Sequence, residues 1–82
     1  MPRVQSISSR VRDLTGGLDA FDVEARTVRA LIRELDARFP GLGELVEENM
    51  AIAIDGEIFQ DALGASLGEA SEIVLIPKIS GG

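Results

Sequence analysis

The sequence of 82 residues predicts an α+β domain in which a mixed sheet of about five strands packs on one main helix. An apolar stripe within residues 27–40 predicts the helix, and the Asp-Gly pair at 55–56 predicts a hairpin. Residues 73–76 are apolar on both faces, which is typical of a strand in the middle of a sheet. We expect a single domain over residues 1–77, followed by a flexible tail over residues 78–82.

The N-terminal part predicts a first hairpin. Residues 4–11 have the weak apolar pattern of a strand, and the two glycines within residues 14–18 predict a turn. The turn would lead into a second strand over residues 20–25, where three apolar residues alternate with two acidic ones. Such alternation indicates a sheet with one dry and one wet face, and the dry face needs a cover.

The main helix supplies this cover. Thr27 is the expected N-cap, and apolar residues follow at helical spacing: Val28, Leu31, Ile32, Leu35 and Phe39. Glu34 and Arg38 are spaced for a weak ion pair, and we expect the charged side to be a solvated face. Pro40 ends the helix, and residues 42–49 read as a short acidic connection with at most one helical turn.

The Asp55-Gly56 pair fits a two-residue type I′ loop between strands over residues 51–54 and 57–60. This loop fixes the register, so that Ile52 faces Phe59 and Ala53 faces Ile58. The side of the sheet shared with the helix would then carry Ile52, Ile54 and Phe59, and the other side would carry Ala53 and Ile58. We expect the last strand to lie parallel to the first, at the centre of the sheet.

The composition narrows the classes of function. Fourteen acidic and eight basic residues give a net charge of -6, which disfavours nucleic-acid and membrane partners and favours a partner with a basic docking surface. The chain has no His and no Cys, so it lacks the usual general base, a thiolate nucleophile and the commonest metal ligands. We therefore expect neither an enzyme in its own right nor a metal site. Residues 1–12 contain no hydrophobic stretch, which predicts a cytoplasmic protein.

The sequence closes on Gly81-Gly82. Glycine has no Cβ and accepts nearly all backbone angles, so this end can enter a narrow channel that a bulkier residue would block. The arrangement suits an enzyme that reaches the terminal carboxylate itself. A linker remnant is the plain alternative, since chain ends are usually loose.

Three segments together resemble the MoaD and ThiS family of sulfur carriers. They are Val11-Arg12-Asp13-Leu14-Thr15-Gly16-Gly17, the helical residues 27–40, and residues 73–82, where an apolar strand, a proline and a short spacer precede Gly-Gly. The resemblance covers essentially the whole chain and implies the ubiquitin-like β-grasp fold. Each segment alone is a weak motif, but their combination in one small acidic domain is more specific.

The resemblance implies a substrate protein with no bound cofactor. An adenylating enzyme would use ATP to activate the Gly82 carboxylate, and a sulfur donor would convert it to a thiocarboxylate. Gly81, Ser80 and Ile79 would form the rest of the tail. The sulfur would serve molybdopterin, thiamine, cysteine or tRNA thiolation, and a molybdopterin-synthase-like large subunit is one partner that the family offers.

A docking surface is also expected. If the helix covers Ile52, Ile54 and Phe59, the uncovered face holds Ile58 and either Ile73 with Leu75 or Val74 with Ile76. The family's partner surface favours Ile58 and Ile76, so the docking candidates are Ile58, Val74, Ile76 and Pro77.

The chain departs from the molybdopterin branch of the family, which tends to place aromatic residues on its first and last strands. This chain has Ser6 and Ser8 on the first and the aliphatic Val74 and Ile76 on the last, and it has Lys78 where that branch often has proline. Two further functions stay open: a protein modifier joined through Gly82 to target lysines, and an interaction domain without tail chemistry.

Overall fold

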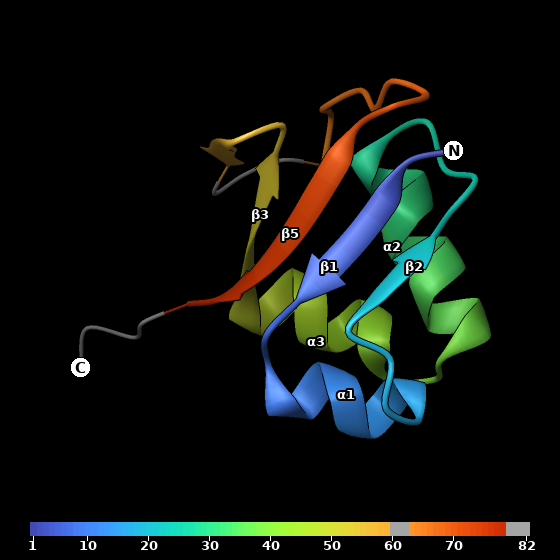
Figure 1. Ribbon diagram of the computed structural model, residues 1–82, viewed down its shortest axis with the longest axis vertical. Helices are drawn as coiled ribbons and strands as arrows, with labels where there is room; N and C mark the ends of the chain where they lie inside the picture. Colours follow the sequence, from blue (N-terminus) through green and yellow to red (C-terminus); the bar gives the residue numbers. More distant parts are fainter. Residues whose placement is uncertain (60–62, 79–82) are drawn as a thin grey trace.

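The computed structural model describes residues 1–59 and 63–78. Within these residues the elements are β1 (Arg3–Ser6), α1 (Ser9–Thr15), β2 (Ala20–Asp22), α2 (Val28–Arg38), α3 (Leu42–Asn49), β3 (Met50–Ile54), β4 (Glu57–Phe59) and β5 (Glu72–Pro77). The strands form one sheet in the order β2-β1-β5-β3-β4, with α2 and α3 on one face and α1 beyond the end of β1 (Figure 1). The predicted α+β fold with a mixed five-stranded sheet and one main helix, α2, is confirmed, and α1 and α3 are additions to it.

The last strand lies at the centre of the sheet, as the sequence predicts. β5 runs parallel to β1, with Val4 opposite Ile73, and antiparallel to β3, with Ile52 opposite Leu75. Ile73 and Leu75 are fully buried, whereas Val74 and Ile76 are half-buried on the other face. β5 therefore has the central position predicted for it, with one apolar face in the core and a second apolar face that the helices do not cover.

The hairpin between β3 and β4 has the predicted register, in which Ile52 pairs with Phe59 and Ala53 with Ile58. Asp55 and Gly56 have φ angles of 49° and 86°, the left-handed values that a type I′ turn requires. The Asp55 carboxylate also accepts a hydrogen bond from the backbone N–H of Glu72 at 2.9 Å, which ties the turn to the start of β5.

The predicted first hairpin is wrong in its connection. β1 and β2 are antiparallel neighbours, but the strand predicted over residues 4–11 ends at Ser6, and a helix follows it. Ser8 caps this helix by accepting a hydrogen bond from the backbone N–H of Arg10, and Gly16 ends it with a φ of 74°. Val11 and Thr15, four residues apart, are its buried face, so the local period is helical.

The second strand is shorter than predicted, because its pairing with β1 ends at Asp22. The predicted alternation nevertheless holds beyond that residue. Val23 and Ala25 are buried, and Phe21 packs against the core from the same side. The backbone N–H of Val23 donates to the carbonyl of Pro2 at 2.9 Å, so this extension stays beside the N-terminus.

Helix α2 begins and packs as the sequence predicts. The hydroxyl oxygen of Thr27 accepts a hydrogen bond from the backbone N–H of Ala30 at 3.1 Å, which makes Thr27 the N-cap. Val28, Leu31 and Leu35 have no exposed surface, while Ile32 and Phe39 pack against the core at its edge. This stripe and the inward side chains of β1, β3 and β5 belong to one core, and α2 lies on the same face of the sheet as α3 (Figure 1).

Residues 42–49 form a full helix, α3, rather than the predicted acidic connection. Leu42, Leu45 and Val46 are buried and recur at helical spacing. The glutamates between and after them make the segment resemble a polar connection in the sequence. A Cβ built on Gly43 would lie 2.7 Å from the Cβ of Asp36 and 2.8 Å from the carbonyl oxygen of Ile32. The missing side chain of Gly43 therefore lets α3 approach α2 closely.

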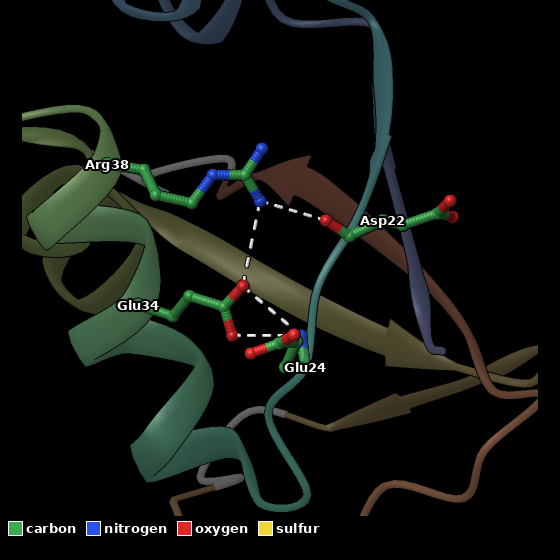
Figure 2. Close-up of polar contacts among 4 residues, drawn as sticks. All are labelled: Asp22, Glu24, Glu34 and Arg38. Carbon is green, nitrogen blue, oxygen red and sulfur yellow. Dashed lines mark hydrogen bonds and ion pairs between the residues drawn. The ribbon is translucent and has the colours of Figure 1, made fainter.

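The charged side of α2 is more than a solvated face. Arg38 lies 3.6 Å from Glu34, as the spacing predicts, and it also donates to the carbonyl of Asp22 at 2.8 Å (Figure 2). Both carboxylate oxygens of Glu34 accept from the backbone N–H of Glu24, at 3.0 and 3.1 Å. The guanidinium carbon of Arg38 also lies 5.3 Å from the ring centroid of Phe21 and 5.2 Å from that of Phe39. These contacts join α2 to the edge strand β2 and to the residues that follow it.

Candidate functional site

The candidate docking surface is the open face of the sheet, the side turned away from α2 and α3. Strand pairing places Ala53 between Ile58 on one side and Val74 on the other, and it places Ala51 beside Ile76. Ile58 is 62% exposed, and Val74 and Ile76 are half-buried. We call these five residues the apolar patch: Ala51, Ala53, Ile58, Val74 and Ile76. Ala51 is half-buried and Ala53 is buried between its neighbours, so Ile58, Val74 and Ile76 supply most of the accessible apolar surface, which is typical of an interaction surface.

The sequence left two pairs of β5 residues open for this face, and the structure decides between them. Ile73 and Leu75 are fully buried beneath the helices, so Val74 and Ile76 belong to the open face together with Ile58. Pro77 does not join them. It is exposed, but it pairs with the buried Met50 and alternates to the other side of β5. The docking role of all four candidates stays a prediction.

One feature near the patch was missed from the sequence. Ile7 is 88% exposed just beyond the end of β1 and, with Val74, lines a surface hollow of about 360 Å³. Gln5, Ser6, Asp19 and Ala20 complete the lining. The strand predicted over residues 4–11 includes Ile7, and a strand position does not indicate this exposure. The usable signal was Ser8, since an N-cap at that position places Ile7 before the helix.

The tail residues predicted to carry the chemistry, Ile79, Ser80, Gly81 and Gly82, lie outside the described residues. The structure does place the strand that leads to them. β5 ends at Pro77, and the backbone N–H of Lys78 donates to the carbonyl of Asn49 at 2.9 Å. Ile76 is the last residue of the apolar patch along the chain, and the described residues end two positions later at Lys78.

The described part of the chain, residues 1–59 and 63–78, has neither a membrane-spanning helix nor a cluster of metal ligands. It contains no helix with the length and hydropathy to cross a membrane. It also contains no group of three or more Asp or Glu side chains placed to hold a metal ion.

The chain matches one protein family and several solved structures. The model of the ThiS family matches residues 6–82. A search of the curated proteins finds no match. Among solved structures, CysO of Mycobacterium tuberculosis has a TM-score of 0.84 at 20% identity, covering 96% of this chain and all of that one.

Two further structures have the same fold. The BexX/CysO complex of Amycolatopsis orientalis gives a TM-score of 0.82 at 22% identity over the full length of both chains. The small archaeal modifier protein 1 of Methanosarcina acetivorans gives 0.79 at 20% identity, covering 99% of this chain and 95% of that one. The chain has the ubiquitin-like β-grasp fold and, on the family match over nearly its whole length, belongs to the ThiS family.

Proposed function

We propose that this protein is a sulfur carrier whose reactive group is the carboxylate of Gly82. The observation that carries the proposal is the family match, which runs to residue 82 and so includes the Gly81-Gly82 pair. The fold supports it, because the central strand β5 carries part of the apolar patch and ends at Pro77, five residues before Gly82 in the sequence. The chain contributes docking and reach, and a partner supplies the catalysis.

The chemistry needs an activating enzyme of the ATP-dependent adenylating class. A carboxylate oxygen of Gly82 attacks the α-phosphorus of ATP, pyrophosphate leaves, and a mixed anhydride of Gly82 and AMP forms. A hydrosulfide-class sulfur donor then attacks the acyl carbon, AMP leaves, and a thiocarboxylate remains. Activation is required because a carboxylate is a poor electrophile, and the enzyme provides the electrostatic stabilisation of the exchange.

The apolar patch is the proposed docking site for the activating enzyme. Ile58, Val74 and Ile76 present apolar surface from two strands, and docking there brings the enzyme to the point where the tail begins. The net charge of -6 adds a preference for a basic partner surface. Pro77, which ends β5 and alternates to the other side of the strand, stays a docking candidate at the edge of the patch.

Steady-state adenylation tests the docking proposal. With the purified activating enzyme and ATP, we expect Ile58→Asp and Ile76→Asp to raise the KM for this protein about tenfold or more, as for central interface residues. Leu18→Asp is the matched control, because Leu18 is also an exposed apolar residue, 41% exposed, but lies outside the patch. Equal effects of all three substitutions would refute a docking role for the patch.

The recipient of the sulfur is part of the proposal. Molybdopterin, thiamine and cysteine synthesis and tRNA thiolation all remain candidates, with a molybdopterin-synthase-like large subunit as partner in the first. The aliphatic Val74 and Ile76 on β5 and the lysine at position 78 favour a recipient other than the molybdopterin branch. Deleting the gene and supplying each pathway's end product in turn identifies the recipient by which product restores growth.

A protein modifier is the second candidate, favoured by the structural similarity to the small archaeal modifier protein of Methanosarcina acetivorans. The two functions share the adenylate and differ in the nucleophile that follows. Ile-Ser-Gly-Gly remnants on lysines of cellular proteins, which tryptic cleavage after Lys78 would leave, would support the modifier if peptide mass spectrometry finds them for the wild-type chain and not for a chain lacking Gly82. An interaction domain without tail chemistry would tolerate that deletion in every assay.

A further inference from the structure

The hollow beside Ile7 has a chemical character of its own. Its six lining residues include two branched apolar side chains, one carboxylate and no cation: Gln5, Ser6, Ile7, Asp19, Ala20 and Val74. Val74 also belongs to the apolar patch, so the hollow continues the proposed docking surface from β5 across β1 to β2. A partner that covers the patch therefore also reaches the hollow.

We propose that this hollow receives one arginine side chain of the activating enzyme, an inference that rests on the proposed function. Ile7 and Val74 offer apolar surface for the aliphatic stem of the arginine, and Asp19 offers a carboxylate for its guanidinium. Arginine is enriched in interfaces because it combines apolar contact with paired hydrogen bonds from a planar group.

The polar groups of the hollow differ in their availability. The Ser6 hydroxyl already donates to the carbonyl of Leu75 at 3.2 Å and accepts from the backbone N–H of Ser8 at 3.1 Å. The side chains of Asp19 and Gln5 are exposed and make no hydrogen bond or ion pair with the residues that the structure describes. The guanidinium would therefore pair with the Asp19 carboxylate, with the Gln5 amide oxygen as a second acceptor.

The exposure of Ile7 supports an occupant with an apolar stem. At 88%, its exposure is greater than that of Met1 at 64% or Ile58 at 62%. A single exposed apolar residue needs no explanation, but here it forms one wall of a hollow that is continuous with other apolar side chains. A small anion or a purely polar group would leave that wall exposed to water.

Binding affinity for the activating enzyme, measured by calorimetry with the full-length chain, tests the inference. We expect Asp19→Asn to weaken binding about fivefold and to reduce its dependence on salt, as loss of an interfacial charge pair does. Asp13→Asn removes the same charge from the exposed surface of α1, outside the hollow, and should change the affinity less than twofold. Ile7→Ser should also weaken binding, whereas its control Leu18→Ser should not.

Alanine replacement of surface arginines in the enzyme then identifies the partner side chain. One Arg→Ala variant should weaken binding to the wild-type chain but not further weaken binding to Asp19→Asn, the signature of a direct pair. Equal effects of Asp19→Asn and Asp13→Asn, or coupling of Asp19 to a lysine instead, would overturn the inference. If Ile76→Asp weakens binding while Asp19→Asn does not, the proposed function stands and the arginine is refuted. If the wild-type chain is never adenylated, both are overturned.

Discussion

Replacing Gly43 with alanine tests the close approach of α3 to α2, and it should lower stability where helix propensity alone predicts a gain. A helical Gly→Ala change normally stabilises by about 0.5–1 kcal/mol, because glycine loses more backbone entropy on folding. At Gly43 the new methyl group would stand 2.7 Å from the Cβ of Asp36 and 2.8 Å from the carbonyl oxygen of Ile32. Neither atom is the far end of a flexible side chain, so the backbones of the two helices must separate.

The expected change in stability is the steric cost of the added methyl group minus the gain in helix propensity. Forcing an extra methyl group into a packed interface costs about 1–3 kcal/mol, which exceeds the propensity gain. Separation of the helices would also disturb the Asp36 carboxylate, which accepts from the backbone N–H groups of Gly41 and Gly43, at 3.2 Å each. We therefore expect Gly43→Ala to lower the free energy of unfolding by about 1–2 kcal/mol.

Urea denaturation monitored by circular dichroism measures this change. Gly64→Ala is the matched control, because a Cβ at Gly64 meets nothing within 4 Å and should leave the midpoint almost unchanged. A Gly43→Ala protein as stable as the wild type, or more stable, would refute the packing argument. The KM for adenylation should not change, since Gly43 belongs to α3, which lies on the face of the sheet opposite the apolar patch.

Three further predictions concern the elements that hold the sheet in place. Arg38→Met should lower the free energy of unfolding by about 1 kcal/mol, because it removes the hydrogen bond to the carbonyl of Asp22 and the contacts with two aromatic rings. The rate of amide hydrogen exchange should then rise in β2 rather than in β5. Thr27→Ala should also cost about 1 kcal/mol by removing the N-cap of α2, while Thr27→Ser should retain most of the stability in the same urea titration. Gly56→Ala should cost about 1–2 kcal/mol because φ there is 86°; a neutral result would mean that the turn has another geometry.

Much of the fold could be predicted where a local rule and the global arrangement agree. The Asp55-Gly56 pair fixes the register of its hairpin because a two-residue turn leaves no freedom in the pairing. The position of β5 follows from its apolar residues on both faces, which only a central strand explains. Helix α2 could be predicted for the same reason, because the N-cap residue Thr27 and the helical spacing of the apolar residues after it both indicate one helix.

The two missed helices show where sequence patterns compete. In α1, Val11 and Thr15 repeat at four residues behind a Ser8 cap, but weak polar and apolar alternation nearby favoured a strand. In α3, the buried Leu42, Leu45 and Val46 lie among acidic residues that read as a connection. Both helices are short, and short helices depend on tertiary contacts more than on their own pattern.

The candidate site could be predicted in part. The alternation along β5 limited its open face to two pairs of residues, and burial by the helices selects Val74 and Ile76. The hollow could not be predicted, because it joins Ile7 and Asp19 from opposite ends of α1 through the pairing of β1 with β2. Only the three-dimensional arrangement brings those residues to Val74.

The intact mass of the protein after incubation with its activating enzyme, ATP and a sulfide source tests the central claim most directly. We expect the protein to gain the mass difference between sulfur and oxygen, with no gain when ATP is omitted or Gly82 is deleted. An unchanged mass under conditions where ATP is consumed, or a mature chain that extends past Gly82, would contradict the assignment of this carboxylate as the reactive group.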